Sequence, residues 1–281
     1  MITKHNHRIV YPVLSILFPC ILGIAGMIRE NVSSVIWIQN VAFILLATIV
    51  CLCVLKLRMK FNYKIIVFVS ILLLGLTFIG PNIDGVHRWL RIPFFTLNIA
   101  TIVIPITIVA FYRLIEEKQY VMSLIGTIVI AVFLFLQPDA SQLLAFSLPM
   151  IVLLLKSKIS KVITTSFSMV LLLLTLKSWI ELDSLQPINY TEGILTMVYD
   201  TSIVLYIIGI ASLLWVPICF LVLCQKQSRN ICVGITLYYW MMICATFVGN
   251  FPVPFMGYGL SPILGFYIFL IWFINDFNSN Y

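Results

Sequence analysis

Asn250 to Gly259 reads NFPVPFMGYG, a stretch without charge that joins two strongly apolar runs. Pro252 and Pro254 lack backbone N–H donors and have a fixed φ, so a helix cannot pass through them without a large energetic cost. Gly257 and Gly259 permit positive φ and a close approach of one backbone to another. Uncharged, non-helical backbone is tolerated at membrane depth only inside protein or beside a water-filled cavity. The stretch is therefore expected to be a packed re-entrant loop that lines a cavity, and a tight turn in the membrane interface is the alternative.

The composition indicates that the solvent around this chain is lipid. Of its 281 residues, 62% are hydrophobic and 10% are charged, and the mean hydropathy is +1.11. A soluble domain is roughly half apolar and about a quarter charged. Here the charges form short clusters between apolar runs of roughly 17–25 residues, the length that crosses a bilayer as a helix. We predict one all-α membrane domain over residues 1–281 with ten spans, at about 9–27, 34–55, 62–80, 95–112, 119–136, 140–156, 161–180, 201–224, 231–249 and 260–275.

The distribution of Lys and Arg predicts the orientation, because cytoplasmic loops of membrane proteins are enriched in both. With the N-terminus inside, four of the 17 Lys and Arg residues fall outside: Arg29, Arg88, Arg91 and Lys177. Both termini are therefore expected in the cytoplasm, and the isoelectric point near 9.1 reflects topology rather than nucleic-acid binding. The first span begins like a signal peptide, but the charge bias over ten spans needs it, so it is expected to be retained.

The first outer polar cluster runs from Gly80 to Pro93 and begins with turn residues, Gly-Pro and then Asp-Gly. It then places Arg88 and Arg91 three residues apart, on one face if the segment is helical. Two arginines on the outer side run against the charge bias, and phosphate is the usual partner of an arginine fork. The alternative is that both side chains reach toward lipid headgroups, with Trp89 in the interfacial belt of aromatic residues.

Two further outer segments carry carboxylates. Asp139 lies in the short link Gln137-Pro-Asp-Ala-Ser-Gln142, where it is expected to cap the following helix while facing the outer cavity. The longest outer loop, about residues 181–200, holds four acidic residues, which are candidates for a general base or a metal ligand; a solvated acidic loop is the alternative. Asp200 is the strongest candidate base, because it stands where this loop re-enters the membrane.

Three of these stretches, in this order, resemble motifs of the bacterial SEDS proteins (shape, elongation, division and sporulation), the FtsW/RodA/SpoVE group. Gly85-Val-His-Arg-Trp-Leu90 is similar to the family's Gly-Ala-Arg-Arg-Trp-Ile stretch after its third span. The Gln137 link is similar to the family's Gln-Pro-Asp-Leu-Gly-Thr, between its fifth and sixth spans. The 250–261 stretch stands where the family has Gly-Ile-Pro-Leu-Pro-Phe-Ile-Ser-Tyr-Gly-Gly-Ser. The resemblance covers nearly the whole chain and agrees with ten spans and two cytoplasmic ends.

The resemblance implies a peptidoglycan glycosyltransferase of the bacterial cytoplasmic membrane. Active family members polymerise lipid II on the outer face, usually with a class B penicillin-binding protein. A carboxylate, here Asp200 or Asp139, would take a proton from a sugar hydroxyl that attacks the anomeric carbon of the lipid-linked donor. Arg88 or a divalent cation such as Mg²⁺ or Mn²⁺ would stabilise the leaving pyrophosphate. The other residues expected at the substrate are His87, Trp89, Arg91, Gln137, Pro252, Pro254, Tyr258, Gly259 and Ser261.

The chain departs from the family pattern at the residues that carry acid–base chemistry. An ungapped match to the family's His-Thr-Asp-Phe-Ile-Phe sets Ser202 at the position of the presumed catalytic Asp, with Asp200 two residues earlier. The charged residues of the family's fourth and eighth spans are missing as well. The alternative function is therefore a catalytically degenerate SEDS protein that binds lipid-linked precursor or a penicillin-binding protein. A transporter or flippase is disfavoured, because the charges lie at the ends of spans rather than within them.

Overall fold

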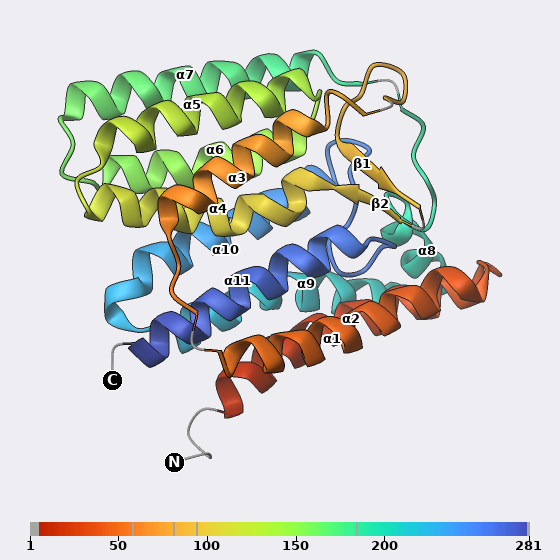
Figure 1. The fold of residues 1–281 in the computed structure, drawn as a ribbon. Coiled ribbons are helices and arrows are strands. Elements are labelled where there is room, and N and C mark those ends of the chain that lie inside the picture. Colours follow the sequence, from red (N-terminus) through yellow and green to blue (C-terminus); the bar gives the residue numbers. More distant parts are fainter. Residues whose placement is uncertain (1–5, 58, 81, 94, 184, 280–281) are drawn as a thin grey trace. The chain divides into compact units, whose positions relative to one another are not determined.

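The computed structural model describes residues 6–57, 59–80, 82–93, 95–183 and 185–279 (Figure 1). Each of the ten predicted spans overlaps one α-helix in this part of the chain, and a short additional helix, α8, precedes α9. The helices are α1 (Asn6–Arg29), α2 (Ser34–Leu55), α3 (Tyr63–Leu76), α4 (Ile99–Glu116), α5 (Tyr120–Leu136), α6 (Ala140–Leu155), α7 (Lys161–Ile180), α8 (Ile194–Thr201), α9 (Ile203–Leu223), α10 (Arg229–Ala245) and α11 (Leu260–Ser279), with one 3-10 turn at Lys226–Ser228.

Helix length and composition agree with a membrane protein. Helices α1, α2, α4, α7 and α9 are long and apolar enough to cross a bilayer, and α3, α5, α6 and α11 are shorter apolar helices within the described residues. Side-chain oxygens fix several helix starts, as at Asn62, which accepts hydrogen bonds from the backbone N–H groups of Lys64 and Ile65. The number of helices that span the bilayer stays a prediction.

The helices form two compact units. Unit 1 comprises residues 1–59, 186–226 and 242–281, and unit 2 comprises residues 60–185 and 227–241. In unit 1, α1 packs against α8 and α9, and α11 packs against α2. In unit 2, α4 packs against α3, α5 and α6, and is itself largely buried. The prediction of a single membrane domain over residues 1–281 stays a prediction.

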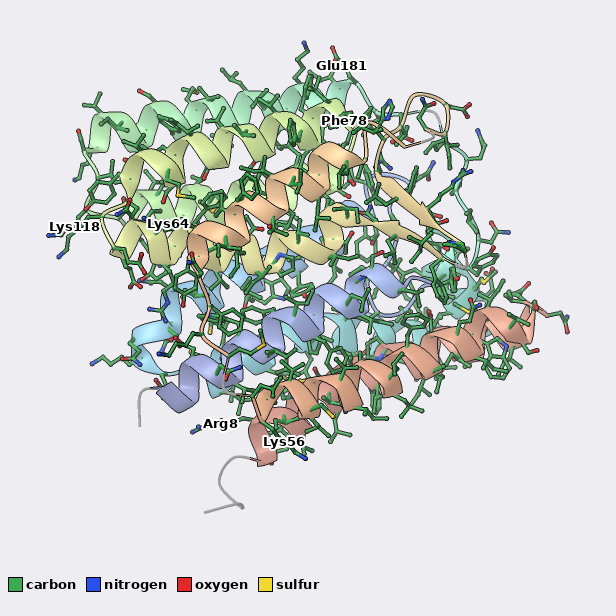
Figure 2. The ribbon with its side chains drawn as sticks, in the orientation of Figure 1. Arg8, Lys56, Lys64, Phe78, Lys118 and Glu181 are labelled. Carbon is green, nitrogen blue, oxygen red and sulfur yellow. The ribbon has the colours of Figure 1, made fainter. Side chains whose placement is uncertain are left out.

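Charged side chains lie at opposite ends of the helices within unit 2. Figure 2 shows Lys64 and Lys118 at one end of this unit and Glu181 at the other. In unit 1, Arg8 and Lys56 lie together at one end (Figure 2). The predicted orientation requires basic residues at one end of the helices in each unit. The cytoplasmic location of the basic end of each unit stays a prediction.

A β-hairpin replaces the start of the fourth predicted span. Strand β1 (Trp89–Ile92) pairs antiparallel with β2 (Phe95–Asn98), and α4 begins only at Ile99, where the Asn98 side chain caps it. The condition on which Arg88 and Arg91 would share one face, a helical segment, is therefore not met. In an extended chain, residues three apart point to opposite faces. Accordingly, Arg88 is buried and Arg91 is exposed.

The turn predicted from the Asp-Gly pair is confirmed. Asp84 and Gly85 both have positive φ, 49° and 81°, between the bridged residues Ile83 and Val86. This conformation suits a two-residue hairpin turn, for which Asp-Gly is a favoured pair. The Gly85 N–H also donates to the Asn82 side chain at 3.2 Å. The turn brings the chain back so that Arg88 enters the interior of unit 2.

Candidate functional site

Arg88 is a buried cation in unit 2, with 6% of its side chain exposed. Its guanidinium donates to the backbone carbonyl of Pro138 and to a carboxylate oxygen of Asp183. Its Nε lies 3.6 Å from Oδ2 of Asp139. We call Arg88, Asp139 and Asp183 the Arg88 cluster. It joins the segment before β1, the link between α5 and α6, and the loop after α7.

Asp139 holds its place in this cluster through several hydrogen bonds. It caps α6, as predicted: its Oδ1 accepts from the Gln142 backbone N–H at 3.2 Å and from the Ser141 hydroxyl at 2.9 Å. Its Oδ2 accepts from the Asn98 amide at 3.5 Å. A carboxylate with this many donors is fixed in orientation. The cap does not exclude the catalytic role considered for Asp139, which stays a prediction.

The Arg88 cluster carries two formal negative charges against one positive charge. A buried ion pair survives only when its geometry is good and its remaining lone pairs are hydrogen-bonded, because desolvation of the ions is costly. Arg88 donates to the Pro138 carbonyl, and Asp139 accepts hydrogen bonds from Asn98 and at the helix cap; these bonds offset part of the desolvation cost. The cluster therefore fixes the Arg88 guanidinium in a position where it can bind an anion when one of the two carboxylates moves away from it.

The neighbouring predicted residues differ in their surroundings. Gln137 is buried, and its amide donates to the Thr77 hydroxyl at 2.8 Å and the Leu74 carbonyl at 3.2 Å, at the end of α3. His87 packs against Phe78, with ring centroids 5.4 Å apart. The ring centroid of Trp89 lies 5.9 Å from the guanidinium carbon of Arg88. Gln137 thus supports the fold around the cluster, whereas His87 and Trp89 flank the arginine.

A second buried network extends from the cap of α6. The Tyr238 hydroxyl donates to the Gln142 side-chain oxygen at 3.0 Å, and the Gln142 amide donates to the Thr101 hydroxyl at 3.4 Å. Tyr238 and Gln142 are both fully or almost fully buried. Because buried polar groups are costly when unsatisfied, this network fixes the start of α6 beside α4 and α10.

The 250–259 loop is packed and non-helical, as predicted, and belongs to unit 1. Asn40 in α2 holds it at two points: its amide donates to the Gly257 carbonyl at 3.1 Å, and its oxygen accepts from the Gly259 N–H at 3.3 Å. Pro254 is buried and Pro252 partly buried, and Ser261 is buried in the first turn of α11. The part played by this loop at a substrate stays a prediction.

Tyr258 ties the same loop to the segment before α8. Its backbone N–H donates to the Tyr190 carbonyl at 2.8 Å, and its hydroxyl donates to the Gln39 side chain at 2.9 Å. Burial, and then the neighbouring Tyr190 phenol, raises the pKa of Tyr258 above its ordinary value. The phenol therefore stays protonated and keeps its donor role.

Replacing Asn40 with alanine should destabilise the protein by about 1–3 kcal/mol, because it leaves a buried carbonyl and a buried N–H without their partner. The measurement is thermal or denaturant unfolding in detergent. Cys53→Ala, at an exposed position of the same helix, is the matched control and should change stability by less than about 0.5 kcal/mol. Equal effects of the two substitutions would contradict the role assigned to Asn40.

Asp200 lies in the last turn of α8, in unit 1, and is exposed. Its side chain forms no hydrogen bond or ion pair with any residue that the structure describes. Ser202 follows in an extended conformation, with φ −169° and ψ 132°, and its hydroxyl accepts from the Val204 N–H at 3.2 Å. Helix α9 thus begins directly after the residue that stands where the family has its Asp.

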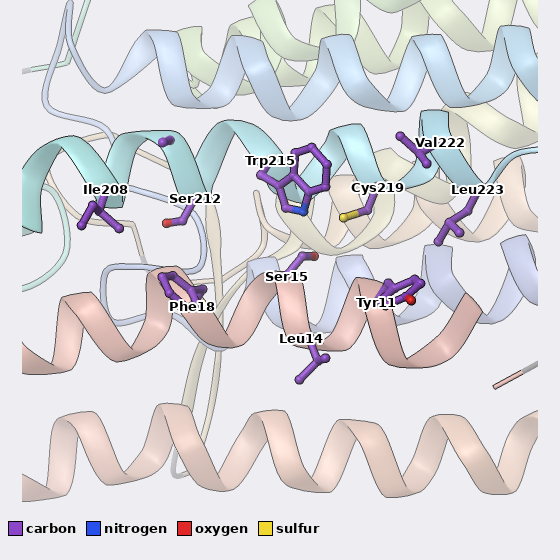
Figure 3. Close-up of a pocket in the computed structure, with 11 residues that line it drawn as sticks. Tyr11, Leu14, Ser15, Phe18, Ile208, Ser212, Trp215, Cys219, Val222 and Leu223 are labelled. Atoms are coloured by element: carbon purple, nitrogen blue, oxygen red, sulfur yellow. The ribbon is translucent and has the colours of Figure 1, made fainter. Parts of the chain in front are cut away.

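No three His, Cys, Asp or Glu side chains come close enough to hold a metal ion among the residues that the structure describes. The divalent cation considered from the sequence stays a prediction. A groove of about 510 Å³ lies between α1 and α9 (Figure 3). Its serines, Ser15 and Ser212, donate to carbonyls of their own helices, and most of the other lining side chains are apolar.

Sequence reasoning missed Asn40 and the pairing of Asp183 with Arg88. Asp183 was one of four acidic residues in a loop, and no local pattern relates it to an arginine 95 positions earlier. Asn40 gave a usable signal, because an amide inside an apolar membrane helix commonly bonds to a neighbouring segment.

Apolar helices with buried polar clusters at their ends define an all-α, polytopic membrane protein. A sequence model of the FtsW/RodA/SpoVE family, described as cell cycle protein, matches residues 8–186. The chain belongs to this family and is a SEDS-like cell-wall protein, a multi-pass protein of a bacterial membrane.

Solved structures agree with the family. An Asp-to-Ala variant of the Thermus thermophilus rod shape determining protein RodA matches with a TM-score of 0.70 at 14% identity, over 99% of both chains. Another crystal structure of the same RodA matches with a TM-score of 0.68 at 14% identity, over 99% of this chain and 98% of that chain. Among curated protein sequences none matches significantly. At this identity the structures show the fold alone.

Proposed function

We propose that this chain is a peptidoglycan glycosyltransferase that polymerises lipid II, or a related polyprenyl-pyrophosphate-linked sugar. It would act on the outer face of the bacterial cytoplasmic membrane, with both termini inside and a class B penicillin-binding protein as partner. The observation that carries the proposal is Arg88, a buried guanidinium that a fixed carboxylate orients beside a second, less constrained carboxylate. An arginine held in this way is suited to a phosphate group.

The proposed reaction is the transfer of a sugar from a pyrophosphate. The Asp200 carboxylate accepts the proton of a sugar hydroxyl. The oxygen of that hydroxyl forms a bond to the anomeric carbon of the donor at the same time. The anomeric carbon–oxygen bond breaks with inversion, and polyprenyl pyrophosphate leaves with the electron pair. Arg88 stabilises the negative charge that develops on this leaving group, and Asp139 orients Arg88. One such stabilising group contributes on the order of 10²–10³ to the rate. No step is assigned to a metal.

Replacing Asp200 with asparagine should lower the rate of glycan polymer formation at least ~100-fold, because loss of a general base removes a factor of about 10²–10⁴. The measurement is polymer formed from labelled lipid II by purified protein. Asp84→Asn is the matched control, since Asp84, like Asp200, is an exposed carboxylate, and it should retain activity. Equal activity of Asp200→Asn and wild type would remove Asp200 from the mechanism.

The second candidate is a catalytically degenerate SEDS protein that binds lipid-linked precursor or a penicillin-binding protein. The observation that favours it is Ser202, which caps α9 at the position of the family's presumed catalytic Asp. The same assay separates the two functions. Absence of polymer from wild-type protein that still binds lipid II would support the binding role over the enzyme.

A further inference from the structure

Asp183 shares the guanidinium edge of Arg88 that a phosphate would need. One terminal nitrogen of Arg88 donates to both the Pro138 carbonyl and the Asp183 carboxylate, while Nε faces Asp139. Carboxylate and phosphate oxygens bind this edge of arginine in the same manner. The position of the Asp183 carboxylate is therefore that of a bound anion.

The two carboxylates of the Arg88 cluster differ in how firmly they are held. Asp139 has 2% of its side chain exposed and is fixed by the cap of α6 and by Asn98. Asp183 lies on the loop after α7, has 13% of its side chain exposed, and accepts one further hydrogen bond, from the nearby Leu185 N–H at 3.1 Å. Asp183 is thus the partner that can leave Arg88 without unfolding a helix.

Charge makes the two anions exclusive. With Asp183 in place, the cluster has a formal charge of −1, and a pyrophosphate next to it would be repelled and would find the guanidinium edge occupied. We propose that Asp183 is an intramolecular competitor for the anion site of Arg88, and that a phosphate-bearing ligand binds by displacing the Asp183 carboxylate. The inference rests on the proposed function for the ligand class, a polyprenyl pyrophosphate. It adds that a weakly charged headgroup does not displace the Asp183 carboxylate and therefore does not bind to Arg88.

Replacing Asp183 with asparagine should tighten the binding of polyprenyl pyrophosphate about tenfold, which corresponds to about 1.4 kcal/mol. Asparagine keeps the shape of the side chain and removes the charge that competes for Arg88. The measurement is titration of the full chain in phosphatidylcholine nanodiscs with undecaprenyl pyrophosphate. Titration of the same discs with inorganic pyrophosphate distinguishes binding of a free anion from binding of a lipid-linked one. Tighter binding of either probe by Asp183→Asn than by wild type supports displacement.

Glu181→Gln is the matched control, because it removes the same charge from the same loop. Glu181 is exposed and lies 3.9 Å from Lys177, away from the Arg88 cluster. The control should bind as wild type does, and Asp183→Glu, which keeps the charge, should bind less tightly than Asp183→Asn. An equal gain in Glu181→Gln and Asp183→Asn would overturn the inference, as would unchanged or weaker binding by a folded Asp183→Asn protein.

Unmodified protein provides a second readout that does not depend on the folding of a variant. Hydroxyl-radical footprinting should show greater labelling of Leu185, which is partly buried, when undecaprenyl pyrophosphate saturates the site. Unchanged or reduced labelling would count against displacement. If wild type binds and forms polymer while Asp183→Asn gains nothing, this inference fails and the proposed function stands. If neither protein binds, both fail.

Discussion

Replacing Arg88 with methionine should lower the free energy of unfolding by about 3–5 kcal/mol, because it leaves Asp139 and Asp183 buried without their cation. Methionine keeps most of the apolar stem of the arginine side chain, so the decrease in the free energy of unfolding reflects mainly the loss of the positive charge. The measurement is denaturant or thermal unfolding of purified protein in detergent. The same variant should also lose affinity for lipid II if Arg88 contacts the pyrophosphate.

Arg91→Met is the control for this prediction. Arg91 lies in β1, three residues further along, but is exposed, so its loss should change stability by less than about 0.5 kcal/mol. Removing the two carboxylates together with Arg88, as Arg88→Met with Asp139→Asn and Asp183→Asn, should recover part of the loss, because the variant no longer buries an unpaired charge. Similar stabilities of Arg88→Met and Arg91→Met would refute the picture of a buried cluster held together by the Arg88 cation.

Replacing Gly23 with alanine should destabilise the protein by about 3 kcal/mol, although alanine is normally the better helix residue. A Cβ at Gly23 in α1 would stand 2.0 Å from the backbone carbonyl oxygen of Met256, in the 250–259 loop. Backbone cannot rotate away as a side chain can, so α1 and the loop must separate. The measurement is again unfolding in detergent, read against wild type.

Gly75→Ala gives the opposite expectation. Gly75 is also inside a helix, α3, but its added Cβ would meet only the Phe133 ring, at an ordinary distance of 3.6 Å. The variant should therefore gain about 0.5–1 kcal/mol from helix propensity. A stabilising Gly23→Ala would show that α1 and the loop do not lie in close contact.

The positions of the long helices could be predicted because apolar runs bounded by charge clusters leave few alternatives. The β1–β2 hairpin could not, because Phe95–Asn98 is only four residues long and leads straight into α4, and periodicity does not separate a strand from a helix start at that length. That error carried over to Arg91, which was expected beside Arg88 and points elsewhere.

Of the site, the residues with a local signature were found and those with only a tertiary role were not. Asp139 could be expected at the start of α6 because capping depends on near neighbours in sequence. The pairing of Arg88 with Asp183 depends on how the loop after α7 returns to the hairpin, which no local rule describes. The exposure of Asp200 follows likewise from the break at Ser202, since an unbroken helix would have turned that carboxylate differently.

The close contact between Gly23 and Met256 also constrains how this protein is made. At a synthesis rate of about 5–20 residues per second, α1 emerges on the order of 10–50 seconds before the loop that must pack against it. Most of unit 2, from Lys60 to Leu185, is meanwhile available to assemble. During synthesis α1 therefore exists for this period without the 250–259 loop that packs against it. A chain that stops before residue 250 would leave the face of α1 at Gly23 exposed to other helices in the membrane.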